Sequence, residues 1–326
     1  MTERRWDPFQ REWVVTATHR QDRTFKPPKD YCPFCPSDPA AEFPTAIPES
    51  EYDVAVVENA FPSLQPDPPE PAVESTDLFR TAPATGACEV VLFTDDHDAV
   101  ASEFDVERFQ KLARVWQDRY VDLGDDPDHE YVYIFENRGE EIGVTLDHPH
   151  GQIYAYPFVP PKIERELDAS AAHHEETGEC LFCDVLAAER DDGRRLVSET
   201  EHFTALVPFQ ARYAYEMHVY ADEHVPSLAA FEDRHLDDLG RMLKDVVSRY
   251  DALFGFELPY VMAIHQKPTT AGREAASHFH IEFYPPHRTA DRLKHLAGSE
   301  RGAGTYVNNK LAEEAASELR SCRRSP

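Results

Sequence analysis

The 326-residue sequence contains no apolar run that approaches the roughly 20 residues that a membrane-spanning helix needs. Its first residues, Met1-Thr2-Glu3-Arg4-Arg5, are not followed by the apolar segment that is typical of a secretory signal. These two absences argue against a helical membrane protein and against a secreted one. We therefore expect a soluble, cytoplasmic protein with no membrane partner.

Basic residues are scarce, and lysine is especially so. The chain has 61 acidic residues against 33 basic ones, of which eight are Lys, and its formal net charge is −28. A surface this acidic repels the phosphate backbone of nucleic acids, so we expect no nucleic-acid partner. Two interpretations of the charge stay open, a halophilic protein whose carboxylates keep it hydrated in concentrated salt, and an ordinary acidic enzyme. The spread of the acidic residues along the chain favours the halophilic one.

Cysteine is also sparse, yet four of the six cysteines form two Cys-x-x-Cys pairs, Cys32/Cys35 and Cys180/Cys183. In a cytoplasmic chain with histidines elsewhere, this spacing indicates metal binding before disulfide bonding. Zinc prefers four nitrogen or sulfur ligands in a tetrahedron, and one Cys-x-x-Cys turn supplies two of them. The alternative for either pair is a buried structural feature without a metal.

The order of motifs repeats between the two halves of the chain, and the chain length also favours two domains. Each half has a Cys-x-x-Cys pair, a strand-like stretch, an acidic turn ending in His, a helix-like segment, a second strand-like stretch and two closely spaced histidines. The strand-like and helix-like segments are 89–93, 106–123 and 131–135 in the first half, and 215–220, 235–254 and 260–264 in the second. We interpret the pattern as a duplicated α+β unit, in which antiparallel sheets carry packed helices. The Pro- and acid-rich stretch 36–84 predicts a surface loop or arm, and the polar stretch 157–179 predicts a linker.

The repeat gives each half a candidate set of metal ligands. The sets are Cys32, Cys35, His97 and His148 in the first half, and Cys180, Cys183, His224 and His278 in the second. A site with four protein ligands leaves no position for water and is structural. A third set in the second half competes with the Cys-based one without excluding it, because its nitrogen and oxygen atoms suit iron or zinc. This third set is Glu166, His265, His280 and Glu282.

The segment His148-Pro149-His150-Gly151-Gln152 carries the strongest chemical signal. On a strand, alternate side chains face the same side, so we expect His148, His150 and Gln152 on one face. Imidazole is a good nucleophile near neutral pH, and an amide can donate to a phosphate oxygen while it stays neutral. Buried histidines without partners would be costly, which disfavours plain core packing. The segment is therefore suited to group transfer at phosphorus, with a histidine as the nucleophile and Gln152 as a donor to a phosphate oxygen.

Together with Phe135-Glu136-Asn137-Arg138-Gly139, this segment resembles the active-site region of the galactose-1-phosphate uridylyltransferase family, which belongs to the histidine-triad superfamily. The similarity covers essentially the whole chain, including Arg4 to Pro8, His19 to Arg23, Glu58 to Pro62 and Phe283 to Pro286. The resemblance implies an α+β fold of two tandem histidine-triad-like units. Residues 1–160 would form the unit with the nucleophile and a zinc site, and residues 161–326 the unit with a second metal site. It also implies a homodimer with active sites completed across the interface.

The resemblance further implies a ping-pong reaction of galactose metabolism. His150 would attack the α-phosphorus of UDP-glucose and release glucose 1-phosphate, and galactose 1-phosphate would then take the UMP group. His148 would bind zinc rather than react. Gln152 stands where hydrolytic relatives carry a third His, which fits transfer between phosphates that leave without a proton. The implied substrate-binding positions are Arg20, Arg23, Asn59, Phe61, Asn137, Gly143 and Thr145, and, for the sugar, Lys294, Glu300 and Tyr306.

Several departures from the family pattern bear on sugar and nucleobase preference. Asp147 stands where the family often has Pro, Thr145 where known members have Ser, and Ala60 where some have an acidic residue. Glu282 stands where some members have an iron-binding His. One alternative is therefore an adenylyltransferase or phosphorylase acting on ADP-sugars or dinucleoside polyphosphates. The non-enzymatic alternative is a zinc-stabilised nucleotide-binding scaffold, which would not need His150 beside Gln152.

Overall fold

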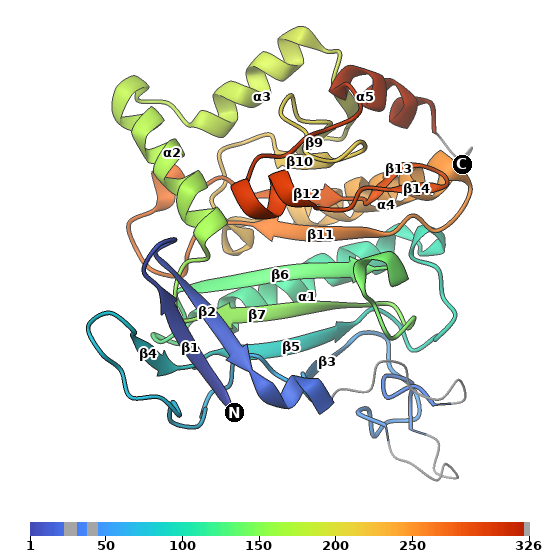
Figure 1. Ribbon diagram of the computed structural model, residues 1–326. Helices are drawn as coiled ribbons and strands as arrows, with labels where there is room; N and C mark the ends of the chain where they lie inside the picture. The colour runs from blue at the N-terminus through green and yellow to red at the C-terminus, as the bar shows by residue number, and fades with distance from the viewer. Residues whose placement is uncertain (23–30, 38–44, 323–326) are drawn as a thin grey trace.

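A nine-stranded antiparallel sheet forms the centre of the molecule in the computed structural model, which describes residues 1–22, 31–37 and 45–322. The strand order is β3-β5-β7-β6-β11-β12-β10-β9-β8. The first half contributes β3 (Ala55–Glu58), β5 (Ala87–Leu92), β6 (Tyr131–Arg138) and β7 (His150–Tyr156). The second half contributes β8 (Leu196–Glu199), β9 (Phe203–Leu206), β10 (Met217–Ala221), β11 (Tyr260–His265) and β12 (His280–Tyr284). Because β6 pairs with β11, one continuous sheet joins the two halves (Figure 1).

Two long helices, α1 (Val106–Gly124) and α4 (Asp233–Phe254), cover one face of the sheet, behind it in Figure 1. Both are amphipathic, and their apolar sides join the main hydrophobic core with the strands. The helices approach each other closely at Gly240, where a Cβ atom would lie 2.7 Å from the backbone nitrogen of Gln110. Each half therefore supplies one helix to a shared core. No helix in the described part of the chain is both long and apolar enough to cross a membrane.

The remaining elements surround this core. The N-terminal strands and β4 form a small sheet, and a two-stranded ribbon follows β12. These strands are β1 (Thr2–Asp7), β2 (Glu12–Ala17), β4 (Thr81–Pro83), β13 (His287–Thr289) and β14 (Arg292–Leu293). The other helices are α2 (Pro161–Thr177), α3 (Leu181–Asp192) and α5 (Ala312–Ser321). Short helical turns are Thr18–Asp22, Ala101–Glu103, Glu140–Ile142, Leu228–Ala230, Glu274–Ala276 and Gly298–Gly302.

The predicted duplicated α+β arrangement is confirmed, since both halves place strands and a long helix where the pattern put them. The stretch predicted as a linker does lie between the strands of the two halves, but most of 157–179 forms helix α2. Its helix signals are a proline at the first helical position and Gly178 at the C-cap with a φ of 81°. The prediction of a plain loop or arm over 36–84 is also incomplete, because that stretch contains β3 and β4.

Candidate active site

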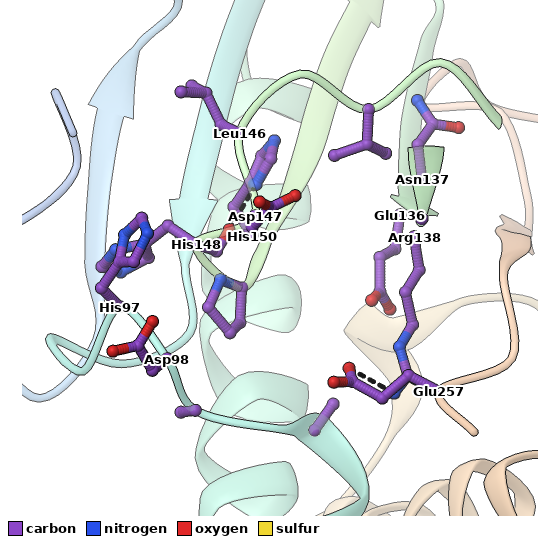
Figure 2. Close-up of a pocket in the computed structure, with 15 residues that line it drawn as sticks. His97, Asp98, Glu136, Asn137, Arg138, Leu146, Asp147, His148, His150 and Glu257 are labelled. Atoms are coloured by element: carbon purple, nitrogen blue, oxygen red, sulfur yellow. Dashed lines mark hydrogen bonds and ion pairs between the residues drawn. The ribbon is translucent and has the colours of Figure 1, made fainter. Parts of the chain in front are cut away.

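Two cavities meet at His150, the first residue of β7. One, of about 310 Å³, has mainly apolar walls from Pro33, Phe34, Ala46, Val57, Phe61, Val90 and Leu146, with Asn59, Thr145 and Gln152 among its polar groups. The other, of about 350 Å³, is polar and is lined by Asp98, Glu136, Asn137, Arg138, Asp147 and Glu257 among others. Figure 2 shows His97 and Asp98 on one side of the polar cavity, and Glu136, Arg138 and Glu257 on the other. A ligand bound at His150 can therefore have an apolar part and a polar part.

The backbone of His148 sets the tautomer of His150. The Nδ1 atom of His150 lies 2.8 Å from the carbonyl oxygen of His148. A carbonyl oxygen only accepts, so Nδ1 donates its hydrogen and the lone pair of the neutral ring is on Nε2. The Phe34 ring packs against the imidazole, with 5.1 Å between ring centroids. The geometry thus presents a nucleophilic nitrogen of fixed orientation.

Gln152 shares a face of β7 with His150, as the alternation of side chains on a strand requires. The Nδ2 atom of Asn59 donates to its Oε1 atom at 3.5 Å, and the Tyr154 hydroxyl donates to the same oxygen at 3.4 Å. With the amide oxygen held in this way, the NH₂ group is the part that can donate to a ligand. The Asn59 Oδ1 atom accepts from the Phe61 backbone N–H at 2.9 Å, so the loop after β3 is tied to the same network.

The first Cys/His set comes together beside His150. The ligand atoms of Cys32, Cys35, His97 and His148 all lie within 4.8 Å of one another. The Nδ1 atom of His148 is 3.8 and 3.7 Å from the two sulfur atoms. Tetrahedral zinc with ordinary bond lengths separates sulfur and nitrogen ligands by about 3.6 Å, so the set fits the ion. Burial lowers the pKa of His148, which favours the neutral imidazole that a metal needs.

His148 does not lie on the strand with His150, contrary to the prediction from the sequence. Strand β7 begins at His150, and the His148 side chain is fully buried among the cysteines. The intervening Pro149 has no N–H to donate to a sheet ladder, which explains why regular pairing begins after it. The Nε2 atom of His148 lies 2.7 Å from the Thr94 carbonyl oxygen and 2.9 Å from the Tyr52 hydroxyl.

The second half contains both of the metal-ligand sets that the sequence offered as competitors. One group consists of Cys180, Cys183, His224 and His278. The other shares no residue with it and consists of Glu166, His265 and His280. The Nδ1 atom of His278 is 3.6 Å from each sulfur atom, close to the tetrahedral separation. Glu282, the fourth member of the third set, lies 3.4 Å from His265 Nε2 and forms an ion pair with Lys162.

His280 is the structural counterpart of His150, but it is closed off. Its Nδ1 atom lies 2.9 Å from the His278 carbonyl oxygen, and the Phe182 ring packs on it with 4.8 Å between centroids. However, His280 is only 3% exposed, and the cavity beside it holds about 10 Å³, room for no more than one water. Helix α2 carries Glu166 into this space. Of the two centres, the geometry leaves the first open to a ligand.

Comparison with known proteins assigns both halves of the chain to one family. The family model for the galactose-1-phosphate uridyl transferase N-terminal domain matches residues 1–160, and the model for its C-terminal domain matches residues 166–324. The chain belongs to the galactose-1-phosphate uridyl transferase family. The relative from Thermotoga maritima is 41% identical over 98% of each chain, and the relative from Haemophilus influenzae is 31% identical over 98% of this chain and 93% of its own.

Solved structures support the same family. A uridylyltransferase structure matches with a TM-score of 0.87 and 32% identity over 98% of both chains. An ADP-glucose phosphorylase from Arabidopsis thaliana with bound ADP-glucose matches with a TM-score of 0.72 and 25% identity, over 98% of this chain and 99% of that one. The fold of the family therefore extends over nearly the whole chain.

Most family positions expected to bind substrate lie around His150. Asn59, Phe61 and Thr145 line the apolar cavity, and Asn137 lines the polar one. Gly143 lies in the loop between β6 and β7, where its φ of 88° suits glycine. Arg20 donates to the Phe61 carbonyl oxygen at 2.8 Å and to the Ser63 hydroxyl at 2.9 Å. Arg23 lies outside the described residues.

The three residues expected to contact the sugar lie elsewhere. Lys294 lines a separate cavity of about 380 Å³ with Tyr213, and its Nζ atom is 3.3 Å from the Glu300 carboxylate. The Tyr306 ring lies 6.5 Å from the Tyr213 ring. Neither of the cavities at His150 is lined by Lys294, Glu300 or Tyr306 of the same chain.

No role was predicted from the sequence for Glu136 or Arg138, which flank Asn137 on β6; Arg138 reaches Asp251 of helix α4. Burial raises the pKa of Glu136 to about 7, and the Tyr260 hydroxyl donates to its carboxylate at 3.2 Å. Arg138 donates to both carboxylate oxygens of Asp251, at 2.9 and 2.8 Å. The alternation of side chains along a strand is the signal that could have separated these two residues from Asn137.

Proposed function

We propose that this protein transfers UMP from UDP-glucose to galactose 1-phosphate through a uridylyl group on His150. The observation that carries the proposal is the orientation of His150, whose Nδ1 donates to the His148 carbonyl oxygen where the two cavities meet. Membership of the galactose-1-phosphate uridyl transferase family supports the same reaction.

In the first step, the Nε2 lone pair of His150 attacks the α-phosphorus, and the bond from that phosphorus to the glucose 1-phosphate oxygen breaks. The leaving phosphate takes the bonding electrons, and it is stable as an anion, so no proton donor is required. The His148 carbonyl oxygen stabilises the positive charge that develops on the ring. In the second step, a phosphate oxygen of galactose 1-phosphate attacks the same phosphorus and the P–N bond breaks, which regenerates neutral His150.

The side chains around His150 suit this transfer. We assign the uridine to the apolar cavity, where Phe34 and Phe61 can pack on the base. The Gln152 NH₂ group can donate to a nonbridging oxygen of the α-phosphate, where negative charge concentrates in the transition state. We assign Asn137, Gly143 and Thr145 to the phosphates, because they lie along the strand end and loop that border both cavities.

We further propose zinc in both Cys/His sets, and iron or zinc in the group of Glu166, His265 and His280 together with Glu282. When bound in the first set, the ion would anchor His148, whose carbonyl oxygen orients His150. The division into units 1–160 and 161–326 is part of the proposal, and the boundary falls between β7 and α2. A homodimer is part of it as well, because Lys294, Glu300 and Tyr306 would have to come from a second copy to contact a sugar at His150.

The test is intact-protein mass spectrometry after the zinc-loaded protein is mixed with UDP-glucose in high salt. A mass gain of one UMP that is acid-labile and base-stable is expected, and His150→Ala should abolish it. His173→Ala is the matched control, because His173 binds Asp184 on the outer helices, and it should keep the adduct.

An adduct from ADP-glucose in place of UDP-glucose would move the function to adenylyl transfer. The solved ADP-glucose phosphorylase shows that the fold can serve such a substrate. Absence of an adduct from either nucleotide in folded, zinc-loaded protein would contradict the mechanism.

A further inference from the structure

Tyr52 lies in the Pro- and acid-rich stretch, and its hydroxyl reaches the first Cys/His set. The hydroxyl donates to the Phe34 carbonyl oxygen at 2.8 Å and lies 2.9 Å from the Nε2 atom of His148. Phe34 is inside the Cys32-to-Cys35 turn, and its ring packs on His150. One hydroxyl therefore touches the turn that carries two ligands and the histidine that supplies another.

The hydrogen positions in this contact are mutually consistent. If Nδ1 of His148 binds the metal, its Nε2 carries the only ring N–H, which can be shared between the Thr94 carbonyl oxygen and the Tyr52 oxygen. The hydrogen of the Tyr52 hydroxyl is then available for the Phe34 carbonyl oxygen. Hydrogen bonds to the second nitrogen of a ligand histidine fix its tautomer and orientation, and their loss typically weakens metal binding.

The Tyr52 side chain and the residue after it are held in place. The ring packs in a small hydrophobic cluster that includes Ile47, Val90 and Leu92. The next residue, Asp53, forms ion pairs with Arg108 and Lys111 of helix α1. The packing of the ring and the ion pairs of Asp53 therefore hold the hydroxyl in position beside His148.

The second Cys/His set provides an internal comparison. The Nε2 atom of His278 lies 2.8 Å from the Ala221 carbonyl oxygen, as His148 Nε2 does from that of Thr94. No hydroxyl hydrogen-bonds to His278 within the described part of the chain. Tyr220 has its ring near His278, but its hydroxyl binds His218 Nδ1 at 2.9 Å.

We propose that Tyr52 is a positioning residue that holds the metal in the first set and, through Phe34 and His148, orients His150 for transfer. This rests on the proposed function, in that it requires a metal in the first set. The role belongs to the catalytic half alone, which agrees with the closed state of the second centre.

The experiment measures zinc release from the full chain to a chelating dye, with Tyr52→Phe in a Cys180→Ser/Cys183→Ser background so that a single Cys/His set contributes. Tyr52→Phe should speed release by about 10-fold, since outer-shell partners commonly affect metal affinity by that much. Tyr220→Phe in the same background is the matched control, and it should leave zinc release from the first set unchanged. Thermal unfolding of Tyr52→Phe with zinc checks that the variant is folded.

A second readout separates positioning from plain stability. Tyr52→Phe should lower the kcat of UMP transfer and leave the KM for UDP-glucose near its original value, because the hydroxyl faces the metal set and not the apolar cavity. Equal zinc release rates with and without the hydroxyl would overturn the inference, and so would a first set that binds no zinc. Faster release from a protein that forms no UMP adduct would instead uphold the metal-holding role of Tyr52 and contradict the proposed function.

Discussion

The Nδ1 atom of His150 lies 2.8 Å from the carbonyl oxygen of His148, so the proposed nucleophile is oriented by the backbone of a proposed metal ligand. The same spacing recurs in the second half, where Nδ1 of His280 lies 2.9 Å from the His278 carbonyl oxygen. The two centres therefore share their local geometry and differ in access. An open cavity lies beside His150, whereas helix α2 closes the space beside His280.

Gln152 should contribute to rate rather than to folding. Gln152→Ala removes the proposed donor to the α-phosphate, and loss of one such donor typically lowers kcat by about 10²- to 10³-fold. Gln152→Glu should be slower still, because it places a negative charge beside the phosphate at nearly unchanged shape. Single-turnover formation of the UMP adduct measures both. A Gln152→Glu variant faster than Gln152→Ala would contradict the assigned role.

The two Cys/His sets should differ in their effect on activity. Cys32→Ser removes a proposed ligand from the set that contains His148 and should reduce UMP transfer by more than about 10-fold, the loss that is typical even for outer-shell partners of a metal. Cys180→Ser is the matched variant in the second half, and it should lower the Tm while the UMP adduct still forms. Zinc content, thermal unfolding and adduct formation are compared for the pair. Equal losses of adduct formation in both variants would contradict the prediction that UMP transfer depends on the first set and not on the second.

Glu136 should make stability depend on pH. Its carboxyl is buried, which raises the pKa from 4.5 in the unfolded chain to about 7 in the folded protein. The folded state therefore binds more protons between these values, so this group's contribution to stability is present below pH 4.5 and is lost as the pH rises through about 7. The loss amounts to about 3 kcal/mol for a shift of this size.

Glu136→Gln should accordingly raise the free energy of unfolding at pH 8 and change it little at pH 5, because the amide carries no charge at either pH. Urea unfolding at the two pH values measures this. Glu257→Gln is the control, since Glu257 lines the same cavity but has a side chain that is 56% exposed, and its effect should be small at both pH values. A stabilisation of Glu136→Gln that is equal at pH 5 and pH 8 would count against the raised pKa.

Salt should stabilise the folded protein. With a net charge of −28, repulsion among surface carboxylates opposes compaction. Raising KCl from about 0.1 M to about 1 M shortens the Debye length from about 10 Å to about 3 Å and should raise the Tm by several degrees. Sucrose at equal osmolality is the control, because it is excluded from the protein surface but does not screen charge, so the Tm rise in KCl should exceed the rise in sucrose. An unchanged Tm in KCl would favour the ordinary acidic enzyme over the halophilic protein.

Local signals in the sequence were sufficient for much of the site. The Cys-x-x-Cys spacing and the repeated His positions predicted both Cys/His groups, because each Cys motif places two sulfur ligands in one turn and the repeated order of motifs supplies two histidines in each half. Strand alternation placed Gln152 with His150. It failed for His148, where Pro149 interrupts the regular ladder.

By itself, then, the sequence determined the duplicated α+β plan, the family and the candidate nucleophile, since these depend on periodicity, spacing and short motifs. Only the tertiary structure decided that β6 and β11 join the halves into one sheet, and that helix α2 closes one of two similar centres. It alone brought Tyr52 to His148, across 96 positions of the chain. Such contacts depend on how distant segments pack, and no local pattern records that packing.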